Sequence, residues 1–309
     1  MNRGDSIYVA GHTGMVGSAL VRALLAEGHG PIVVRTRADL DLRRQDDVDR
    51  FFATERPAYV FLAAATVGGI WANVTRPAEF IRDNLLIQTN VIDAAYRNGA
   101  KKLLFLGSSC IYPKDAPQPI KEEALMTGPL EPTNEAYAIA KIAGIQMLQA
   151  YRKQYGFNGI CLMPPNLYGP GDNYDLESAH VLAALVRKFV EAKERGDEEV
   201  VVWGTGEPKR EFLYVDDLAR ACLIAMERYE GAEVLNVGPG VEGEISVREL
   251  AELVKQAVGY GGSILWDPSK PDGVSRKILS NARMRALGWH ASLRLGQGVE
   301  RTARAFRPQ

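Results

Sequence analysis

The stretch EAYAIAK carries two side chains capable of acid–base chemistry, Tyr137 and Lys141, four residues apart. On a helix this spacing places both side chains on one face. A phenol with an ordinary pKa of ~10 is a weak acid–base catalyst at neutral pH, and a neighbouring ammonium group favours the phenolate. We therefore expect Lys141 to lower the pKa of Tyr137. Without further motifs, the pair would instead indicate a core tyrosine beside a lysine with a buried stem.

A second group of reactive side chains ends an apolar run. In KKLLFLGSSCIYP, Gly107 is followed by Ser108, Ser109 and Cys110. The run is typical of a buried parallel strand, and ligands of open α/β sheets bind at the carboxyl ends of strands. We expect Ser108 to hydrogen-bond a reacting oxygen there. Its neighbour Cys110 is a candidate for the same site, the alternative being a cysteine buried in the core.

The elements that must position these side chains alternate along the chain. Strand patterns cover residues 6–11, 31–36, 58–64, 102–108 and the beginning of 159–169. Helical patterns cover residues 15–27, 46–56, 78–98 and 135–155. Further helices are expected at about 178–195, 215–228 and 246–258, with a strand at 233–237. Strands alternating with helices predict βαβ units, and therefore an α/β fold with a doubly wound parallel sheet.

Three glycines mark the turn between the first strand and the first helix. VAGHTGMVGSAL places Gly11, Gly14 and Gly17 at this turn. Such glycines permit a tight turn, close approach of the backbone to a pyrophosphate, and close packing of helix on strand. A glycine string alone is a weak signal. Its position on the first βα turn favours dinucleotide binding over a plain tight turn.

The end of the second strand distinguishes between cofactors. NAD sites usually place an acidic residue there for the ribose 2′-hydroxyl, whereas a 2′-phosphate needs arginine. VVRTRADLDL has Arg35 and Arg37, and no acid before Asp39. This pattern predicts NADP(H); the alternative is that both arginines belong to a solvated edge.

Taken together, these motifs predict two units around a cleft. Residues 1–168 and about 211–238 would form the NADP-binding Rossmann domain. Residues of about 169–210 and 239–309 would form a smaller C-terminal lobe that binds substrate. Glycine, proline and asparagine at 164–173 and 204–208 mark the long connections between them.

Composition limits the remaining possibilities. The chain has 309 residues, a net charge of −1 and three cysteines, Cys110, Cys161 and Cys222. Near-neutral charge gives no support to nucleic-acid or anionic-membrane binding. No apolar run approaches the ~20 residues of a membrane span, and a strand pattern begins too early for a signal peptide. We expect a cytoplasmic protein without disulfides or a bound metal.

Several longer motifs extend this interpretation. They are AGHTGMVGSAL, VGGIWAN, LLFLGSSCIYPK, LEPTNEAYAIAKIAG, NLYGPGDN, VVVWGTGEPKREFLYVDDLA and DPSKPDG. Through them the sequence resembles the extended short-chain dehydrogenase/reductase superfamily over nearly its whole length, and within it the GDP-L-fucose synthase family. The resemblance implies a 3,5-epimerase and NADPH-dependent 4-reductase that converts GDP-4-keto-6-deoxy-D-mannose to GDP-L-fucose, and a homodimer formed through helices 78–98 and 135–155.

The resemblance also assigns roles to residues. Cys110 and His180 would move the C3 and C5 protons, and Tyr137 would protonate the C4 oxygen with the help of Ser108 and Lys141. His180 could instead simply cap a helix. The residues implied in substrate binding are Lys188, Trp203, Arg210 and Asp272. Those implied in cofactor binding are Gly11, Thr13, Gly14, Met15, Val16, Gly17, Arg37, Asp41, Leu42, Leu106, Gly107, Ser108, Lys141, Pro164, Asn166, Leu167 and His180. Thr13 stands where relatives commonly have arginine, so we expect a modest preference for NADPH.

Rival functions are a related enzyme acting on another GDP-4-keto sugar, such as a heptose or dideoxy analogue, and an NAD-dependent nucleotide-sugar 4-epimerase or dehydratase. The missing acid after the second strand argues against the NAD-dependent enzymes. A non-enzymatic NADP-sensing protein is a third alternative. Such a protein would be expected to lose Tyr137, Lys141 or Ser108, and all three are present.

Overall fold

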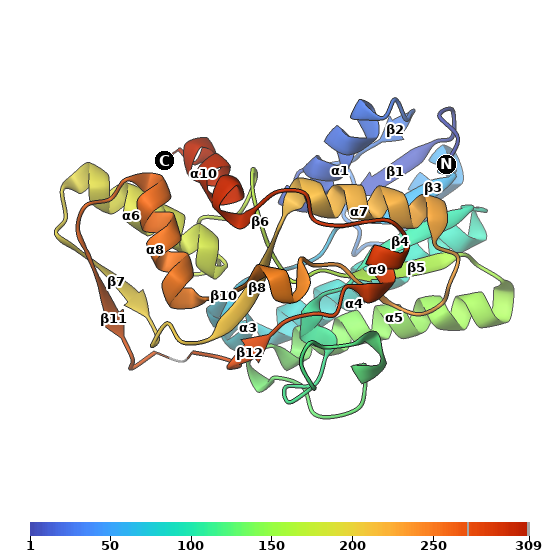
Figure 1. The fold of residues 1–309 in the computed structure, drawn as a ribbon. Coiled ribbons are helices and arrows are strands. Elements are labelled where there is room, and N and C mark those ends of the chain that lie inside the picture. The colour runs from blue at the N-terminus through green and yellow to red at the C-terminus, as the bar shows by residue number, and fades with distance from the viewer. Residues whose placement is uncertain (271, 308–309) are drawn as a thin grey trace.

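A six-stranded parallel sheet forms the larger unit of the protein, in a computed structural model that describes residues 1–270 and 272–307 (Figure 1). The strand order is β2-β1-β3-β4-β5-β9, and every neighbouring pair is parallel. The strands are β1 (Ile7–Ala10), β2 (Ile32–Val33), β3 (Tyr59–Leu62), β4 (Lys102–Leu106), β5 (Gly159–Met163) and β9 (Leu235–Asn236). The predicted doubly wound α/β fold is confirmed.

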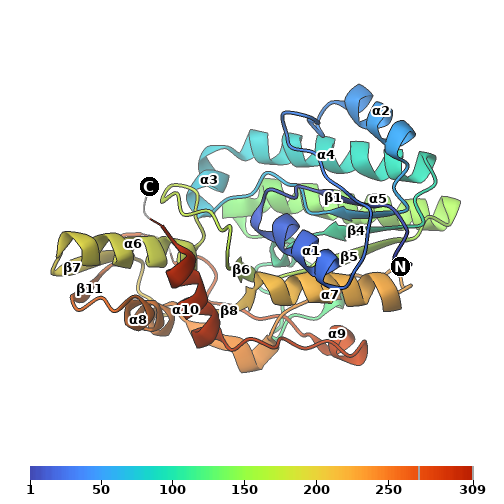
Figure 2. The same cartoon turned by 90° about the horizontal axis from the view of Figure 1, so that it is seen from above.

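Helices cover both faces of this sheet (Figure 2). One face carries α2 (Gln45–Glu55), α4 (Pro77–Arg97) and α5 (Glu135–Tyr155); the other carries α1 (Met15–Ala26), α7 (Val215–Arg228) and the short α9 (Ala282–Ala286). The turn α3 (Ile70–Thr75) leads into α4. All five residues of β4 are buried. A strand covered on both faces needs mainly apolar side chains, which explains the apolar run at residues 103–106 before Gly107. The ammonium group of the buried Lys102 is satisfied by the backbone oxygens of Met226 and Tyr229.

The smaller unit is built around β8 (Lys209–Tyr214). This strand pairs in parallel with β6 (Asn166–Tyr168) and β12 (Arg276–Lys277), and antiparallel with β10 (Glu244–Ser246). A separate parallel pair joins β7 (Glu199–Trp203) to β11 (Ser263–Asp267). The helices α6 (Val181–Arg195), α8 (Val247–Val258) and α10 (Leu295–Ala305) pack against these strands around a core of their own. In the described part of the chain, four short 3-10 turns lie in connections: η1 (Ser109–Ile111), η2 (Glu122–Ala124), η3 (Pro132–Asn134) and η4 (Gly240–Gly243).

The sequence patterns located the long elements well and the short ones poorly. The helices expected at 135–155 and 215–228 are observed at those bounds. The segment 159–169 is two strands, because Pro164 and Pro165 interrupt it and proline has no amide hydrogen for a ladder. Strand β5 enters the large sheet, and β6 pairs with β8 of the lobe. The domain boundaries drawn through these segments stay a prediction.

Local sequence explains where α5 begins and ends. Glu135 lies in its first turn and Arg152 and Lys153 in its last turn, as the helix dipole favours. The helix stops at Gly156, which has a φ of 69° that glycine adopts without strain. Because α5 starts beside the carboxyl end of β4, its first turns carry Tyr137 and Lys141 to that edge of the sheet.

The outer surfaces of the helices concern two expectations from the sequence, the homodimer and the membrane span. Helices α4 and α5 lie side by side on one face, and each exposes an apolar residue, Leu86 and Ile139 respectively. A homodimer through these helices stays a prediction. Among the described residues, no helix has the length and apolar character needed to cross a bilayer.

Candidate functional site

A cavity of about 620 Å³ opens at the carboxyl ends of the central strands and extends to the lobe. It contains every residue expected to bind the cofactor and all five expected to act on substrate. The sequence did not single out residues 63–66 after β3, which also line it. The signal was available, since FLAAAT is the carboxyl end of a parallel strand followed by small residues.

The glycine turn leaves the N-terminus of α1 open to this cavity. Gly11 has a φ of 84°, and a Cβ there would lie 2.8 Å from the Cα of Ala64 on the neighbouring segment. Helix α1 begins after Gly14, with no side-chain cap and no acidic residue in its first turn. Its free N–H groups and positive dipole end therefore fit the pyrophosphate of a dinucleotide.

Changing Gly17→Ala should destabilise this turn. A Cβ at Gly17 would lie 2.1 Å from the backbone oxygen of Gly11, so helix and strand must separate. We expect a loss of roughly 1–3 kcal/mol in the free energy of unfolding, measured by denaturant titration, together with weaker NADPH binding. Gly4→Ala is the control, because no heavy atom lies within 4 Å of its Cβ position. Equal stability of both variants would contradict the packing role of Gly17.

The two arginines after β2 differ in their surroundings. The Arg35 guanidinium pairs with Glu55 and lies 5.4 Å from the centre of the Phe51 ring. Arg37 is exposed at the rim of the cavity. Arg37 is therefore the freer of the two to meet a 2′-phosphate. Asp39 lies outside the cavity lining, and its carboxylate accepts a hydrogen bond from the Thr36 hydroxyl at 2.6 Å.

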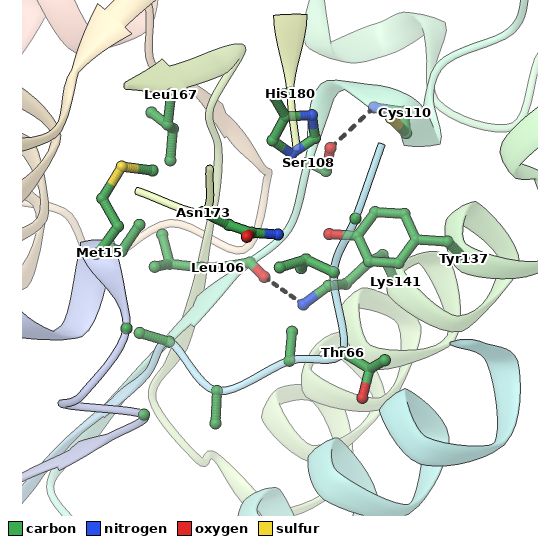
Figure 3. Close-up of a pocket in the computed structure, with 18 of the residues that line it drawn as sticks. Met15, Thr66, Leu106, Ser108, Cys110, Tyr137, Lys141, Leu167, Asn173 and His180 are labelled. Atoms are coloured by element: carbon green, nitrogen blue, oxygen red, sulfur yellow. Dashed lines mark hydrogen bonds between the residues drawn. The ribbon is translucent and has the colours of Figure 1, made fainter. Parts of the chain in front are cut away.

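Tyr137 and Lys141 both lie on α5 and line the cavity, but Lys141 does not have the expected effect on the pKa of Tyr137. Lys141 Nζ donates to the backbone oxygen of Leu106 at 2.9 Å, and burial lowers its pKa to about 7 (Figure 3). The pKa of Tyr137 is raised, chiefly by burial and further by Cys110, with a smaller opposing effect of Ser108. The expected lowering by Lys141 is thus wrong for this structure, because the ammonium group faces a carbonyl and lies 5.8 Å from the phenol ring centre. A protonated phenol is nevertheless suited to donate a proton.

Cys110 lies in the cavity and not in the core. It is half-buried in η1, whereas Cys161 and Cys222 are buried. Its backbone N–H donates to Ser108 Oγ at 3.2 Å, which fixes the two residues relative to each other (Figure 3). The side-chain amide of Asn134 donates to its sulfur at 3.3 Å. The alternative of a core cysteine does not fit this position.

His180 precedes the first turn of α6 but does not cap it. The residue is at the N-cap position, yet its side chain makes no capping hydrogen bond. Its imidazole faces the cavity, near Ser108 in Figure 3. The residue is exposed toward the cavity, and partial desolvation of the ring there lowers the pKa of the imidazole below its ordinary value. The neutral form therefore predominates at neutral pH.

The four residues expected to bind substrate separate into two places. Arg210, on β8, lines the cavity. Lys188 and Trp203 lie outside its lining, with Lys188 Nζ 5.7 Å from the Trp203 ring centre and Lys270 Nζ 5.4 Å from it. Asp272 is also outside, and accepts hydrogen bonds from the backbone and hydroxyl of Thr205 at 2.8 and 2.7 Å. These three could meet only a ligand that extends beyond the cavity.

A buried carboxyl group was missed at the sequence level. Asp172 follows Gly171 in the cavity lining, and burial raises its pKa to about 7. Its Oδ2 has no hydrogen-bond partner among the described residues. The acid in GPGDN gave no periodic or spacing signal, so only the fold reveals that it faces the cavity.

No metal was expected, and the described residues place no group of potential metal ligands in the cavity. One such group, Glu27, His29 and Glu227, lies at the C-terminal ends of α1 and α7. Two of its three members are exposed acids. It has no connection to the site described above.

The first βα turn, the Tyr137–Lys141 pair and the C-terminal lobe all border one cavity. The fold and this cavity place the protein in the class of doubly wound α/β enzymes. The model of the NAD dependent epimerase/dehydratase family matches residues 7–238, and the chain belongs to this family. It is 58% identical to GDP-L-fucose synthase 1 of Arabidopsis thaliana over 301 residues, which cover 97% of this chain and 93% of the relative.

Solved structures agree with this placement. A GDP-L-fucose synthetase from Naegleria fowleri bound to NADP is similar with a TM-score of 0.92 and 32% identity, covering 99% of this chain and 95% of the other. A GDP-6-OMe-4-keto-L-xylo-heptose reductase from C. jejuni is similar with a TM-score of 0.93 and 35% identity, covering 98% of both chains.

Proposed function

We propose that this protein converts GDP-4-keto-6-deoxy-D-mannose to GDP-L-fucose by epimerisation at C3 and C5 and reduction at C4. One NADPH and one proton are consumed and NADP⁺ is formed. The observation that carries the proposal is the convergence of Ser108, Cys110, Tyr137 and His180 on the cavity that the N-terminus of α1 also borders. The family and the relatives described above support it.

The reductive step uses the residues at the carboxyl end of β4 and the start of α5. Bound NADPH would supply a hydride to C4 of the sugar. The oxygen that becomes negative there is a strong base and needs a proton, which the phenol of Tyr137, protonated at neutral pH, would donate even though its raised pKa makes it a weaker acid than an ordinary phenol. Ser108 would hydrogen-bond the same oxygen. Lys141, which is held on the backbone oxygen of Leu106, would help to hold the cofactor.

Epimerisation depends on the acidity that the C4 ketone gives to the neighbouring carbons. Removal of a C3 or C5 proton places negative charge on the ketone oxygen as an enolate. Cys110 would remove each proton, and His180 would return one on the opposite face. Because the surroundings lower the pKa of His180, its acid form is scarce at neutral pH. We therefore expect inversion to slow as the pH rises through the lowered pKa of His180.

Recognition of the nucleotide would use the lobe. Arg210 offers a cation within the cavity, and Lys188, Lys270 and the exposed Trp203 form a neighbouring surface. Cations suit a diphosphate and an indole suits a base. A GDP-sugar that spans both places would have its sugar beside Cys110. Asp272 would act by holding the Thr205 segment in place.

The proposal is tested by incubating the protein with GDP-4-keto-6-deoxy-D-mannose and NADPH. We expect loss of absorbance at the band of the reduced cofactor, and GDP-L-fucose as the product identified by NMR. The GDP-4-keto heptose analogue, supplied in parallel, tests the related reductase. Oxidation of NADPH with the heptose alone, or no oxidation with either sugar, would reject the proposed substrate.

The cofactor preference is tested at Arg37. Arg37→Ala should lower kcat/KM for NADPH by roughly 10- to 100-fold, the effect of losing one hydrogen-bonded charge, and leave kcat/KM for NADH nearly unchanged. Arg44→Ala is the control, since Arg44 is exposed and lies outside the cavity lining. If the parent protein uses both cofactors equally well, the assignment of NADPH is wrong.

A further inference from the structure

The Cys110 sulfur has an amide donor beside it that the proposed mechanism does not yet use. Asn134 Nδ2 lies 3.3 Å from Cys110 Sγ. Asn134 is the last residue of η3, the turn that leads directly into α5, and it lines the cavity. The amide is thus held by the same segment that starts the helix of Tyr137. The contact joins two parts of the chain that are 24 residues apart.

The other end of this amide is unpaired within the described part of the chain. Asn134 Oδ1 is buried and has no hydrogen-bond partner among the described residues. Buried polar atoms are usually paired, and an asparagine amide can reverse its two ends within the same space. The reversed amide would accept a hydrogen bond from an S–H group. With Nδ2 toward the sulfur, as here, the amide offers an N–H donor, which suits a sulfur that has lost its proton.

We propose that Asn134 is a positioning residue for Cys110, whose amide N–H stabilises the thiolate and directs it toward the C3 and C5 hydrogens. The inference rests on the proposed role of Cys110 as the epimerisation base. Asn134 acts through the sulfur and need not touch the substrate.

Other charged and titratable groups also face the thiol, and their effects must be separated from that of Asn134. Arg210 on β8 lies close enough for its charge to interact with Cys110, and Tyr137 on α5 does too. His180, at the start of α6, faces the same cavity. Glu131, ahead of η3, lines the cavity and accepts a hydrogen bond from the Thr133 hydroxyl at 3.3 Å. None of these groups is altered by a change confined to the Asn134 amide.

The test compares Asn134→Leu, which removes the donor, with Asn134→Asp, which places a carboxylate of the same shape beside the sulfur. The first measurement is the rate at which iodoacetamide alkylates Cys110, followed by mass spectrometry from neutral to alkaline pH. We expect the alkylation profile to move to higher pH, more for Asp than for Leu, with a rate at neutral pH lower by about 10-fold for the Asp variant. The buried Cys161 and Cys222 report any opening of the fold.

The second measurement is deuterium uptake at C3 and C5 of the keto-sugar, which should fall in parallel with alkylation while NADPH binding is unchanged. Asn98→Leu is the matched control, because Asn98 bonds the Ala94 carbonyl at the end of α4, away from the cavity. An unchanged alkylation profile in both Asn134 variants overturns the inference, even if both melt at lower temperature. If the parent protein catalyses no exchange, the proposed function fails, and the alkylation comparison still decides whether Asn134 controls Cys110.

Discussion

Changing Tyr137→Phe is expected to slow ketone reduction by ~10²–10⁴, the range for a lost general acid–base group. The ring remains, so its packing against Phe80, 6.3 Å away between ring centres, is kept. Only the proton that neutralises the C4 oxygen is removed. Epimerisation does not need this proton, so deuterium uptake at C3 and C5 should persist at least in part. The measurements are NADPH oxidation in single turnovers and deuterium uptake by NMR.

A control on the same helix separates chemistry from packing. Tyr155→Phe removes a hydroxyl at the exposed end of α5, where the ring stacks on Tyr96. Its reduction rate should match that of the parent protein. Reduction that survives nearly unchanged in Tyr137→Phe would show that another group supplies the proton. The buried Asp172, with its pKa raised to about 7, would then be the next residue to examine.

Four of the five residues proposed to act on substrate were predictable as cavity residues, because sequence patterns place them at one edge of the sheet. An apolar run that ends in GSSC predicts a buried strand with these four residues at its carboxyl end. A tyrosine and a lysine four residues apart on a helix lie on the same face of that helix. Once β4 and α5 are adjacent, Ser108, Cys110, Tyr137 and Lys141 have to meet. The resemblance added His180, whose place in the cavity depends on a long loop that has no periodic signal.

The parts that could not be predicted depend on contacts between distant segments. Asn134 and Asp172 become site residues only because η3 and the GPGDN loop fold over the cavity. The effect of Lys141 on Tyr137 was misjudged for a related reason. Spacing gives the shared face of a helix but not the competing acceptor, which here is the backbone oxygen of Leu106.

The strands of the C-terminal lobe were also not predictable, because they too depend on contacts between distant segments. Strands β10 and β12 have only three and two residues, and β8 pairs with them across long stretches of sequence, so hydrophobic periodicity gives little signal for this sheet. Their pairing nevertheless carries Arg210 into the cavity. The lobe strands are therefore found by pairing and not by local pattern.

Changing Cys110→Ser should abolish most of the epimerisation. Serine keeps the size of the side chain but replaces a thiol with a pKa of ~8.5 by a hydroxyl that is hardly ionised at neutral pH. Deuterium uptake at C3 and C5 should fall by ~10²–10⁴, while NADPH binding stays normal. The ketone that has not been epimerised can still accept hydride, so NADPH oxidation should continue and yield GDP-D-rhamnose or a related sugar in place of GDP-L-fucose.

Two further variants test whether the loss of epimerisation in Cys110→Ser is specific to the Cys110 thiol. His180→Asn should allow exchange to begin but prevent inversion, because the proton is no longer returned on the opposite face. Cys222→Ala, in the buried core of α7, controls for the loss of a thiol elsewhere and should leave exchange and product unchanged. A purely structural Cys110 gives a different pattern, with a lower melting temperature and normal exchange. That pattern would show that a group other than Cys110 removes the C3 and C5 protons, and it would leave Cys110 with a packing role only.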